Sequence, residues 1–174
     1  VSFAYARTLG HTGDPYPPGA DYLYGPNGLL IDDDDNLYVV EQAGGQRMLQ
    51  YDFNFINTLT IGHAGIAGFG EGYLNYPADL LLANNTGNIW IVMDSALKEF
   101  TPAGEQVSIF PNEPAPVVGN DDTHFNQPSG IDTEVCVTGR PVWAEAGRFT
   151  ALGAEALREV GLVVLYAGPG GATA

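Results

Sequence analysis

Short apolar runs alternate with turn-forming residues along the first two thirds of the chain. The run Leu37 to Val40 mixes β-branched and aromatic residues, with four aspartates before it and a glycine-rich stretch after it. Runs of this length, bounded by Asp, Asn and Gly, are typical of strands joined by tight turns. No helical period of comparable length interrupts them as far as Phe110. The pattern therefore predicts an all-β fold.

The apolar runs recur with a fixed period. A four-residue pattern ending in proline occurs three times, and its prolines stand at positions 26, 77 and 128, which are 51 residues apart each time. Downstream, the run Asn36 to Val40 matches Asn88 to Val92, and upstream Thr8 to His11 matches Thr60 to His63. A fixed period of this length indicates a tandem-repeat architecture.

One period reads as four strands: Gly28 to Ile31, Leu37 to Val40, Arg47 to Tyr51 and Phe55 to Ile61. Four-stranded antiparallel units repeated at a fixed period are typical of β-propeller blades, whereas β-solenoid coils usually have shorter periods. We therefore expect a partial propeller. Its blades would cover residues 22–61 and 73–110, with the last strand of an incomplete blade at 1–10 and the start of the next blade at 124–134.

The composition changes near residue 135. Residues 1–134 hold three basic and 18 acidic residues, whereas 135–174 hold three of each. Residues 135–174 are thus either a degenerate third blade or an unrelated tail. Within them, Ala151 to Val160 could form a short helix by propensity or the outer strands of that blade, and we favour the helix.

The period also resembles a known family. From Pro26 to Arg47 the chain has a Pro-x-Gly start, an Asp-rich turn, Asn-apolar-Tyr-Val, an acidic residue, a glycine-rich loop and an arginine. This order resembles the NHL repeat of β-propellers, and Pro77 to Ile91 and Pro128 to Asp132 match it in part. The second repeat departs from the pattern at Asp79, where glycine is usual, and lacks the arginine. The resemblance implies about three and a half propeller blades here, so we expect a piece of a longer protein.

Charge and composition narrow the range of partners. Six Lys and Arg against 21 Asp and Glu give a formal net charge of −15, which disfavours nucleic acid and anionic lipid surfaces. The longest apolar run, Gly161 to Ala167, is too short to span a bilayer, so we expect no membrane insertion. Cys136 is the single cysteine, which rules out an intramolecular disulfide. The acidic, Asn- and Tyr-rich composition and the resemblance to secreted repeat proteins favour an extracellular or cell-surface location.

Two sets of residues invite a metal interpretation. Asp32 to Asp35 gather four carboxylates in one turn, but they lack the alternating ligands, glycine and final glutamate of an EF-hand. His11, His63 and His124 fall in connecting loops that would share one face of a ring, yet equivalent positions of neighbouring blades diverge. Solvation of the turn explains the aspartates more simply than metal binding does. Descent from a common repeat likewise explains the recurring histidines more simply. We therefore expect no metal and no other cofactor.

The alternative to a binding function is an enzymatic one, because some propellers are enzymes. Amidating-lyase-like propellers supply zinc-binding histidines near the end of the second strand, and the matching stretches at Glu41, Asp94 and Glu145 contain none. Gluconolactonase-like propellers use inward acidic residues around a divalent cation, which Glu41 and Asp94 could mimic. No serine or cysteine stands in a nucleophile elbow. We assign no catalytic residue and keep a divalent-metal hydrolase or lyase as the alternative function.

Aromatic residues collect in the loops that connect successive blades. Such loops are common recognition surfaces, although about half of these aromatics could instead fill the gaps between blades. Tyr24 and Tyr76 flank the repeated proline, so we expect them to pack. The aromatic residues expected to contact a partner are Tyr16, Tyr22, Phe69, Tyr73 and Phe125. The predicted function is a non-enzymatic scaffold that recognises a protein or glycan ligand on its loop face and could self-associate through open blade edges.

Overall fold

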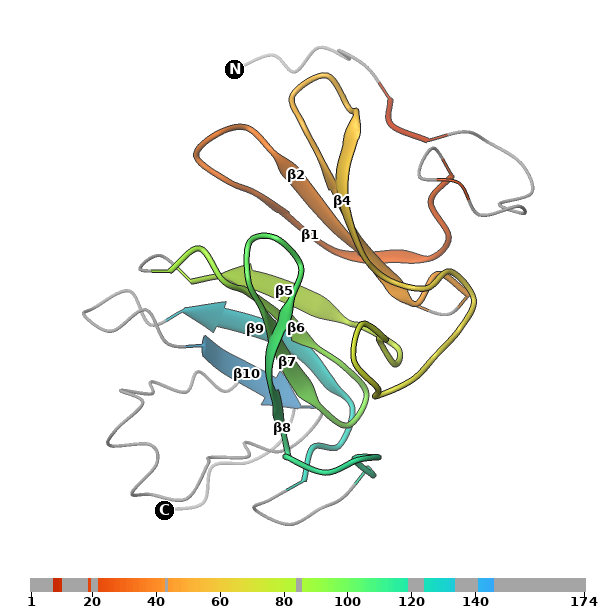
Figure 1. Ribbon diagram of the computed structural model, residues 1–174, viewed down its shortest axis with the longest axis vertical. Helices are drawn as coiled ribbons and strands as arrows, with labels where there is room; N and C mark the ends of the chain where they lie inside the picture. The colour runs from red at the N-terminus through yellow and green to blue at the C-terminus, as the bar shows by residue number, and fades with distance from the viewer. Residues whose placement is uncertain are drawn as a thin grey trace, which may run out of the picture.

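The fold is all-β throughout the part of the chain that the structure describes. The computed structural model describes residues 8–10, 19, 22–42, 44–83, 86–118, 124–133 and 141–145. These residues form ten strands in three antiparallel sheets, without a helix (Figure 1). The predicted fold class is therefore confirmed as a partial β-propeller with four-stranded antiparallel blades. In the described ranges no helix is long and apolar enough to cross a membrane.

The first sheet holds the strands in sequence order. They are β1 (Pro26–Ile31), β2 (Leu37–Glu41), β3 (Arg47–Tyr51) and β4 (Asn57–Gly62). Each strand pairs with the next in antiparallel register, for example Val39 with Leu49 and Leu49 with Thr60. An irregularity in register separates Pro26 from Leu29 in β1. This meander is the unit that the periodic pattern predicts.

The second sheet repeats the plan one period later. Its strands are β5 (Asp79–Leu82), β6 (Ile89–Val92), β7 (Leu97–Phe100) and β8 (Gln106–Phe110), again in sequence order. A third sheet consists of β9 (Pro128–Thr133) paired with β10 (Pro141–Glu145). Strand β10 thus lies within the segment whose membership of a blade the sequence left open. The helix expected at Ala151 to Val160 lies outside the described residues.

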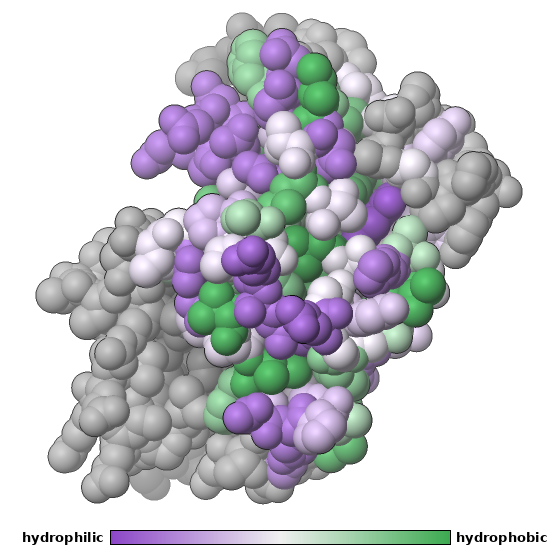
Figure 2. Space-filling view, viewed as in Figure 1, coloured by the Kyte–Doolittle hydropathy of each residue, from purple (hydrophilic) through white to green (hydrophobic). Residues whose placement is uncertain are grey.

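Two turns of the first sheet, between β1 and β2 and between β3 and β4, share one pattern of hydrogen bonds; we call them the outer turns. In the first, the Asp32 carboxylate accepts hydrogen bonds from the backbone N–H groups of Asp34 and Asn36 and from the Tyr38 hydroxyl. Partial burial raises the pKa of Asp32, but these hydrogen bonds together hold it below its ordinary value. Asp52 accepts equivalent backbone bonds in the turn between β3 and β4. The acidic turn, hydrophilic in Figure 2, is therefore organised by Asp32 as a structural element.

The main core lies between the first two sheets. Strand alternation sends Tyr38 and Val40 of β2 into this core together with Met48, where they meet Ile89 and Ile91 of β6. Val39 points to the opposite face with Leu49 and Tyr51. Trp90, equivalent to Tyr38 in the repeat, packs only partly buried on the far side of the second sheet. Each sheet therefore presents two apolar faces, as a propeller blade requires.

The first strand of each sheet, which we call the innermost strand, is β1, β5 and β9 in turn. These strands meet through three repeat-equivalent residues, Gly28, Asp79 and Gly130. The Asp79 carboxylate accepts a hydrogen bond from the N–H of Ile131 in β9 at 3.2 Å. A Cβ atom at Gly28 would lie 2.5 Å from Asp79 Oδ1, so the first blade makes room for this carboxylate. Asp79, a departure from the repeat pattern, thus joins the second innermost strand to the third.

Candidate functional site

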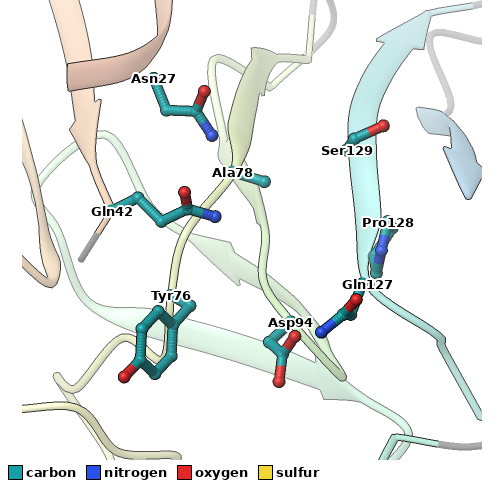
Figure 3. A pocket seen from close by; sticks show the side chains of 8 residues that line it. All are labelled: Asn27, Gln42, Tyr76, Ala78, Asp94, Gln127, Pro128 and Ser129. Carbon is teal, nitrogen blue, oxygen red and sulfur yellow. The ribbon is translucent and has the colours of Figure 1, made fainter. Parts of the chain in front are cut away.

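A pocket of about 470 Å³ opens where the three innermost strands begin. Eight residues from three successive repeats line it: Asn27, Gln42, Tyr76, Ala78, Asp94, Gln127, Pro128 and Ser129. In Figure 3, Gln42 and Gln127 extend toward each other from opposite sides, and Asp94 lies between Tyr76 and Gln127. The volume falls in the range of roughly 300–1,000 Å³ that is usual for small-ligand sites.

The repeat itself builds the pocket wall. Gly25, Tyr76 and Gln127 directly precede the three repeated prolines, and all three have left-handed backbone conformations, with φ of 60°, 49° and 51°. Few non-glycine residues adopt this conformation, and such strain gathers at functional sites. Because the chain turns sharply at these positions, the next residues enter β1, β5 and β9 at the same end of the sheets.

Backbone hydrogen bonds fix the ends of the second strands beside these turns. The N–H of Gln42 donates to the carbonyl of Gly25 at 2.9 Å, and the N–H of Gln127 donates to the carbonyl of Asp94 at 3.0 Å. The N–H of Tyr76 donates to Oε1 of Gln46 at 2.6 Å. Two of these three hydrogen bonds, from Gln127 to Asp94 and from Tyr76 to Gln46, join neighbouring blades, so contacts between blades help to hold the pocket.

Glu41 serves a structural role instead of facing the pocket. It is fully buried, pairs with the guanidinium of Arg47, and accepts a hydrogen bond from the Tyr24 N–H. Of the two acidic residues that the sequence offered for a metal-dependent reaction, Asp94 alone lines the pocket. Within the described ranges, no group of three His, Cys, Asp or Glu residues is arranged to hold a metal ion.

Two buried cations hold the loops that lead into the pocket. Arg47 Nη2 donates to the carbonyls of Gly19 and Tyr22 at 3.1 and 3.0 Å. Lys98 Nζ donates to the carbonyls of Gly70 and Tyr73 at 2.8 and 2.9 Å. The second repeat indeed lacks the arginine, but Lys98 takes its place. Burial lowers the pKa of Lys98 to about 8, although the nearby Glu71 carboxylate acts in the opposite direction.

The aromatic residues predicted to contact a partner divide into groups. Phe125 is fully buried and packs edge-on against Phe110, and Phe69 packs against the main core. Tyr22 and Tyr73 remain partly accessible, and Tyr73 packs against His63 with ring centroids 4.4 Å apart and ring planes tilted by 42°. Tyr16 lies outside the described residues. Phe125 thus lies in the core, while partner contact stays a prediction for Tyr22, Phe69 and Tyr73, which are only partly buried.

The two tyrosines expected to pack behave differently. The Tyr24 ring lies so close to Gly44 that a Cβ there would approach it to 2.0 Å. Tyr76 is 46% exposed and lines the pocket, so the expectation of packing is wrong for it. Its left-handed backbone turns the side chain outward, which the proline beside it did not reveal. Knowledge of the repeat could have found the pocket, since its residues flank the prolines and follow the second strands.

Two of the three histidines that invited a metal interpretation, His63 and His124, lie in the described residues. The His63 ring packs at a tilt against Tyr73, and His124 Nε2 lies 3.4 Å from a carboxylate oxygen of Glu113. His11 lies outside the described residues. The two described histidines therefore each have a local partner in their own loop.

Comparison with known proteins finds similarity only among solved structures. No family model matches the sequence, and no curated protein matches it. The chain is similar to virginiamycin B lyase from Staphylococcus aureus, with 13% identity and a TM-score of 0.48 over 70% of this chain and 34% of the lyase. It is also similar to a streptogramin B lyase, with 18% identity and a TM-score of 0.49 over 74% and 36%. The chain spans about a third of these lyases, and at this similarity their activity does not carry over to it.

Proposed function

We propose that this chain is an NHL-type β-propeller segment that acts as a non-enzymatic recognition scaffold for a protein or glycan ligand. The observation that carries the proposal is the pocket formed by equivalent positions of three repeats. Six of its eight lining residues have side chains that can form hydrogen bonds: Asn27, Gln42, Tyr76, Asp94, Gln127 and Ser129. A concave surface with several convergent polar groups is suited to ligand recognition.

The main alternative is a divalent-metal-dependent hydrolase or lyase. Such a reaction needs several oxygen or nitrogen ligands around one cation, or a base beside a nucleophile. Glu41 is engaged by Arg47 and by the Tyr24 N–H, which leaves Asp94 as the carboxylate at the pocket. The engagement of Glu41 therefore supports recognition over catalysis.

Metal analysis of the purified chain separates the two functions. The recognition scaffold predicts that Zn²⁺, Mg²⁺ and Ca²⁺ stay far below one ion per chain after dialysis. Stoichiometric metal that disappears in the Asp94→Asn variant, but not in an Asp34→Asn variant of the outer turn, would support the enzyme instead. Both substitutions remove one negative charge, so a general charge effect would change the two variants equally.

We further propose an extracellular or cell-surface location, supported by the net charge of −15 and the NHL-like repeat. Cell fractionation with an antibody against the chain tests this proposal. Recovery in the medium or at the cell surface is expected, and recovery with cytoplasmic markers would contradict it.

A further inference from the structure

We infer that the pocket binds a short, uncharged saccharide, an inference that rests on the proposed recognition function and names its ligand class. The argument uses the charge of the pocket wall, the kind of hydrogen-bonding groups on it, and the single aromatic ring at its edge. Each of these restricts the ligand independently.

Charge excludes anionic ligands first. None of the eight lining residues is Lys, Arg or His, and Asp94 contributes a negative charge. The whole chain carries a formal charge of −15, so a phosphate, sulfate or uronic acid would be repelled at long range and would find no cation in the pocket. The ligand is therefore neutral or cationic.

The polar groups favour hydroxyls over a single ammonium. Asn27, Gln42 and Gln127 each bring an amide with both donors and an acceptor, which matches hydroxyl groups that donate and accept together. Asp94 can accept from two neighbouring hydroxyls. Three amides and one carboxylate offer many separate hydrogen-bonding atoms along the pocket wall. A sugar ring with several hydroxyl groups needs such a spread of partners. A lone cation would use Asp94 and leave the amides without a function.

Tyr76 provides the flat surface that a sugar ring needs. Its side chain is 46% exposed and lines the same pocket as the amides. The C–H groups on one face of a pyranose are apolar and pack against an aromatic ring, while the hydroxyls point sideways to polar groups. Ala78 and Pro128, the other apolar lining residues, are themselves buried, so the Tyr76 ring is the apolar surface of the wall that is most open to a ligand.

The backbone holds these groups ready for binding. Tyr76 and Gln127 have left-handed conformations next to prolines, and their N–H groups are bound by Gln46 and Asp94. Because the ligand then does not need to order the turns, little entropy is lost on binding.

The test uses isothermal titration of the purified chain with four neutral tetrasaccharides: cellotetraose, xylotetraose, mannotetraose and tetra-N-acetylchitotetraose. We expect at least one to bind. Tyr76→Ala and Asp94→Asn should each weaken its binding at least tenfold. Phe53→Ala, an exposed aromatic in an outer turn, and Asp34→Asn are the matched controls and should bind as the unchanged chain does. Circular dichroism of each variant confirms that it is folded.

The outcomes separate this inference from the function on which it rests. If none of the four saccharides binds, or if Tyr76→Ala and Asp94→Asn bind as well as their controls, the inference is overturned. If short peptides from a pooled library bind instead and lose affinity in the same two variants, recognition at the pocket stands and the saccharide assignment fails. If neither class binds and stoichiometric metal is found, both proposals fail.

Discussion

Lys98 holds the loop that leads into the second blade as Arg47 holds the loop that leads into the first. The two residues are one 51-residue period apart. Each cation binds two carbonyls of the loop that leads into its own blade, and the carbonyls are themselves repeat-equivalent. Glu41 beside Arg47 accepts a hydrogen bond from the loop, and Met93 Sδ does so at the equivalent place beside Lys98. Only the first cation therefore has a buried carboxylate partner from its own blade.

The burial of the Lys98 ammonium predicts a rise in stability with pH. Its pKa is about 8 in the folded chain and 10.5 without perturbation, so between these values the unfolded chain holds more protons. The free energy of unfolding should then rise with pH across this window, by at most about 3 kcal/mol, at 1.36 kcal/mol per pH unit. Lys98 is the single lysine of the chain, so no other lysine contributes to the difference from Lys98→Met.

Urea titrations of the unchanged chain and of Lys98→Met from pH 7 to pH 10 measure this difference. We expect the unchanged chain to gain stability relative to the variant above pH 8. Parallel curves over the whole range would show that Lys98 does not change protonation in this window.

The contact between Gly28 and Asp79 predicts that β1 does not tolerate a side chain there. A Cβ at Gly28 would lie 2.5 Å from Asp79 Oδ1 and 2.8 Å from its Cα, and the backbone atom cannot turn away. Gly28→Ala should destabilise the chain by about 1–3 kcal/mol. Gly70→Ala is the control, because its Cβ would come no nearer than 3.6 Å to Tyr73. Equal melting temperatures for the two variants would contradict the close packing of β1 and β5.

The burial of Phe125 predicts a role in stability. Its ring is fully buried and lies edge-on to Phe110 with centroids 5.5 Å apart. Phe125→Ala should lower the free energy of unfolding by about 3–5 kcal/mol. Phe53→Ala, at a ring that is 62% exposed, should change it by less than about 0.5 kcal/mol. A denaturant titration in which the two variants unfold together would show that the cluster of Phe125, Phe110 and Leu97 is loosely packed.

We also propose that the exposed apolar side chains of β1 support self-association. Leu29 and Ile31 are 68% and 64% exposed, whereas the repeat-equivalent Leu80 and Leu82 pack against the first sheet. Added salt screens the charge of −15, so we expect larger particles in light scattering as ionic strength rises. The double variant Leu29→Thr and Ile31→Thr should remain monomeric. Val107→Thr, an exposed residue of β8, is the control and should associate as the unchanged chain does.

The sequence predicted the strands well because two local signals coincide in them. Alternation of apolar residues and Asp- or Gly-rich turns both depend on near neighbours, so Leu37 to Glu41 could be recognised without knowledge of its surroundings. Lys98 stands one 51-residue period after Arg47, but it was missed because its strand begins after a shorter loop and because the repeat pattern has an arginine at this position. Asp79 looked like a mere departure from the repeat, since its partners Gly28 and Ile131 lie in other blades.

The pocket was harder to predict for the same reason. Gln42 and Gln127 are 85 positions apart in the sequence (127 − 42), and they face each other only because three innermost strands begin at the same end. The outward turn of Tyr76 depends on its left-handed backbone, which nothing in its residue type predicts. Local patterns therefore identified the blades, whereas the pocket follows from the repeat only when equivalent positions of the three blades are considered together.

Recognition at this pocket is tested most directly by side-chain amide signals in nitrogen-15 NMR spectra. The four tetrasaccharides and a pooled peptide library are titrated separately into the labelled chain, with the Asn27, Gln42 and Gln127 amides assigned by substitution. We predict that at least one titration shifts these three amide signals together and saturates, while the Asn57 amide of the outer strand β4 stays unchanged. Saturable shifts at Asn57 with unmoved pocket amides, or no shifts in any titration, would contradict recognition at this pocket.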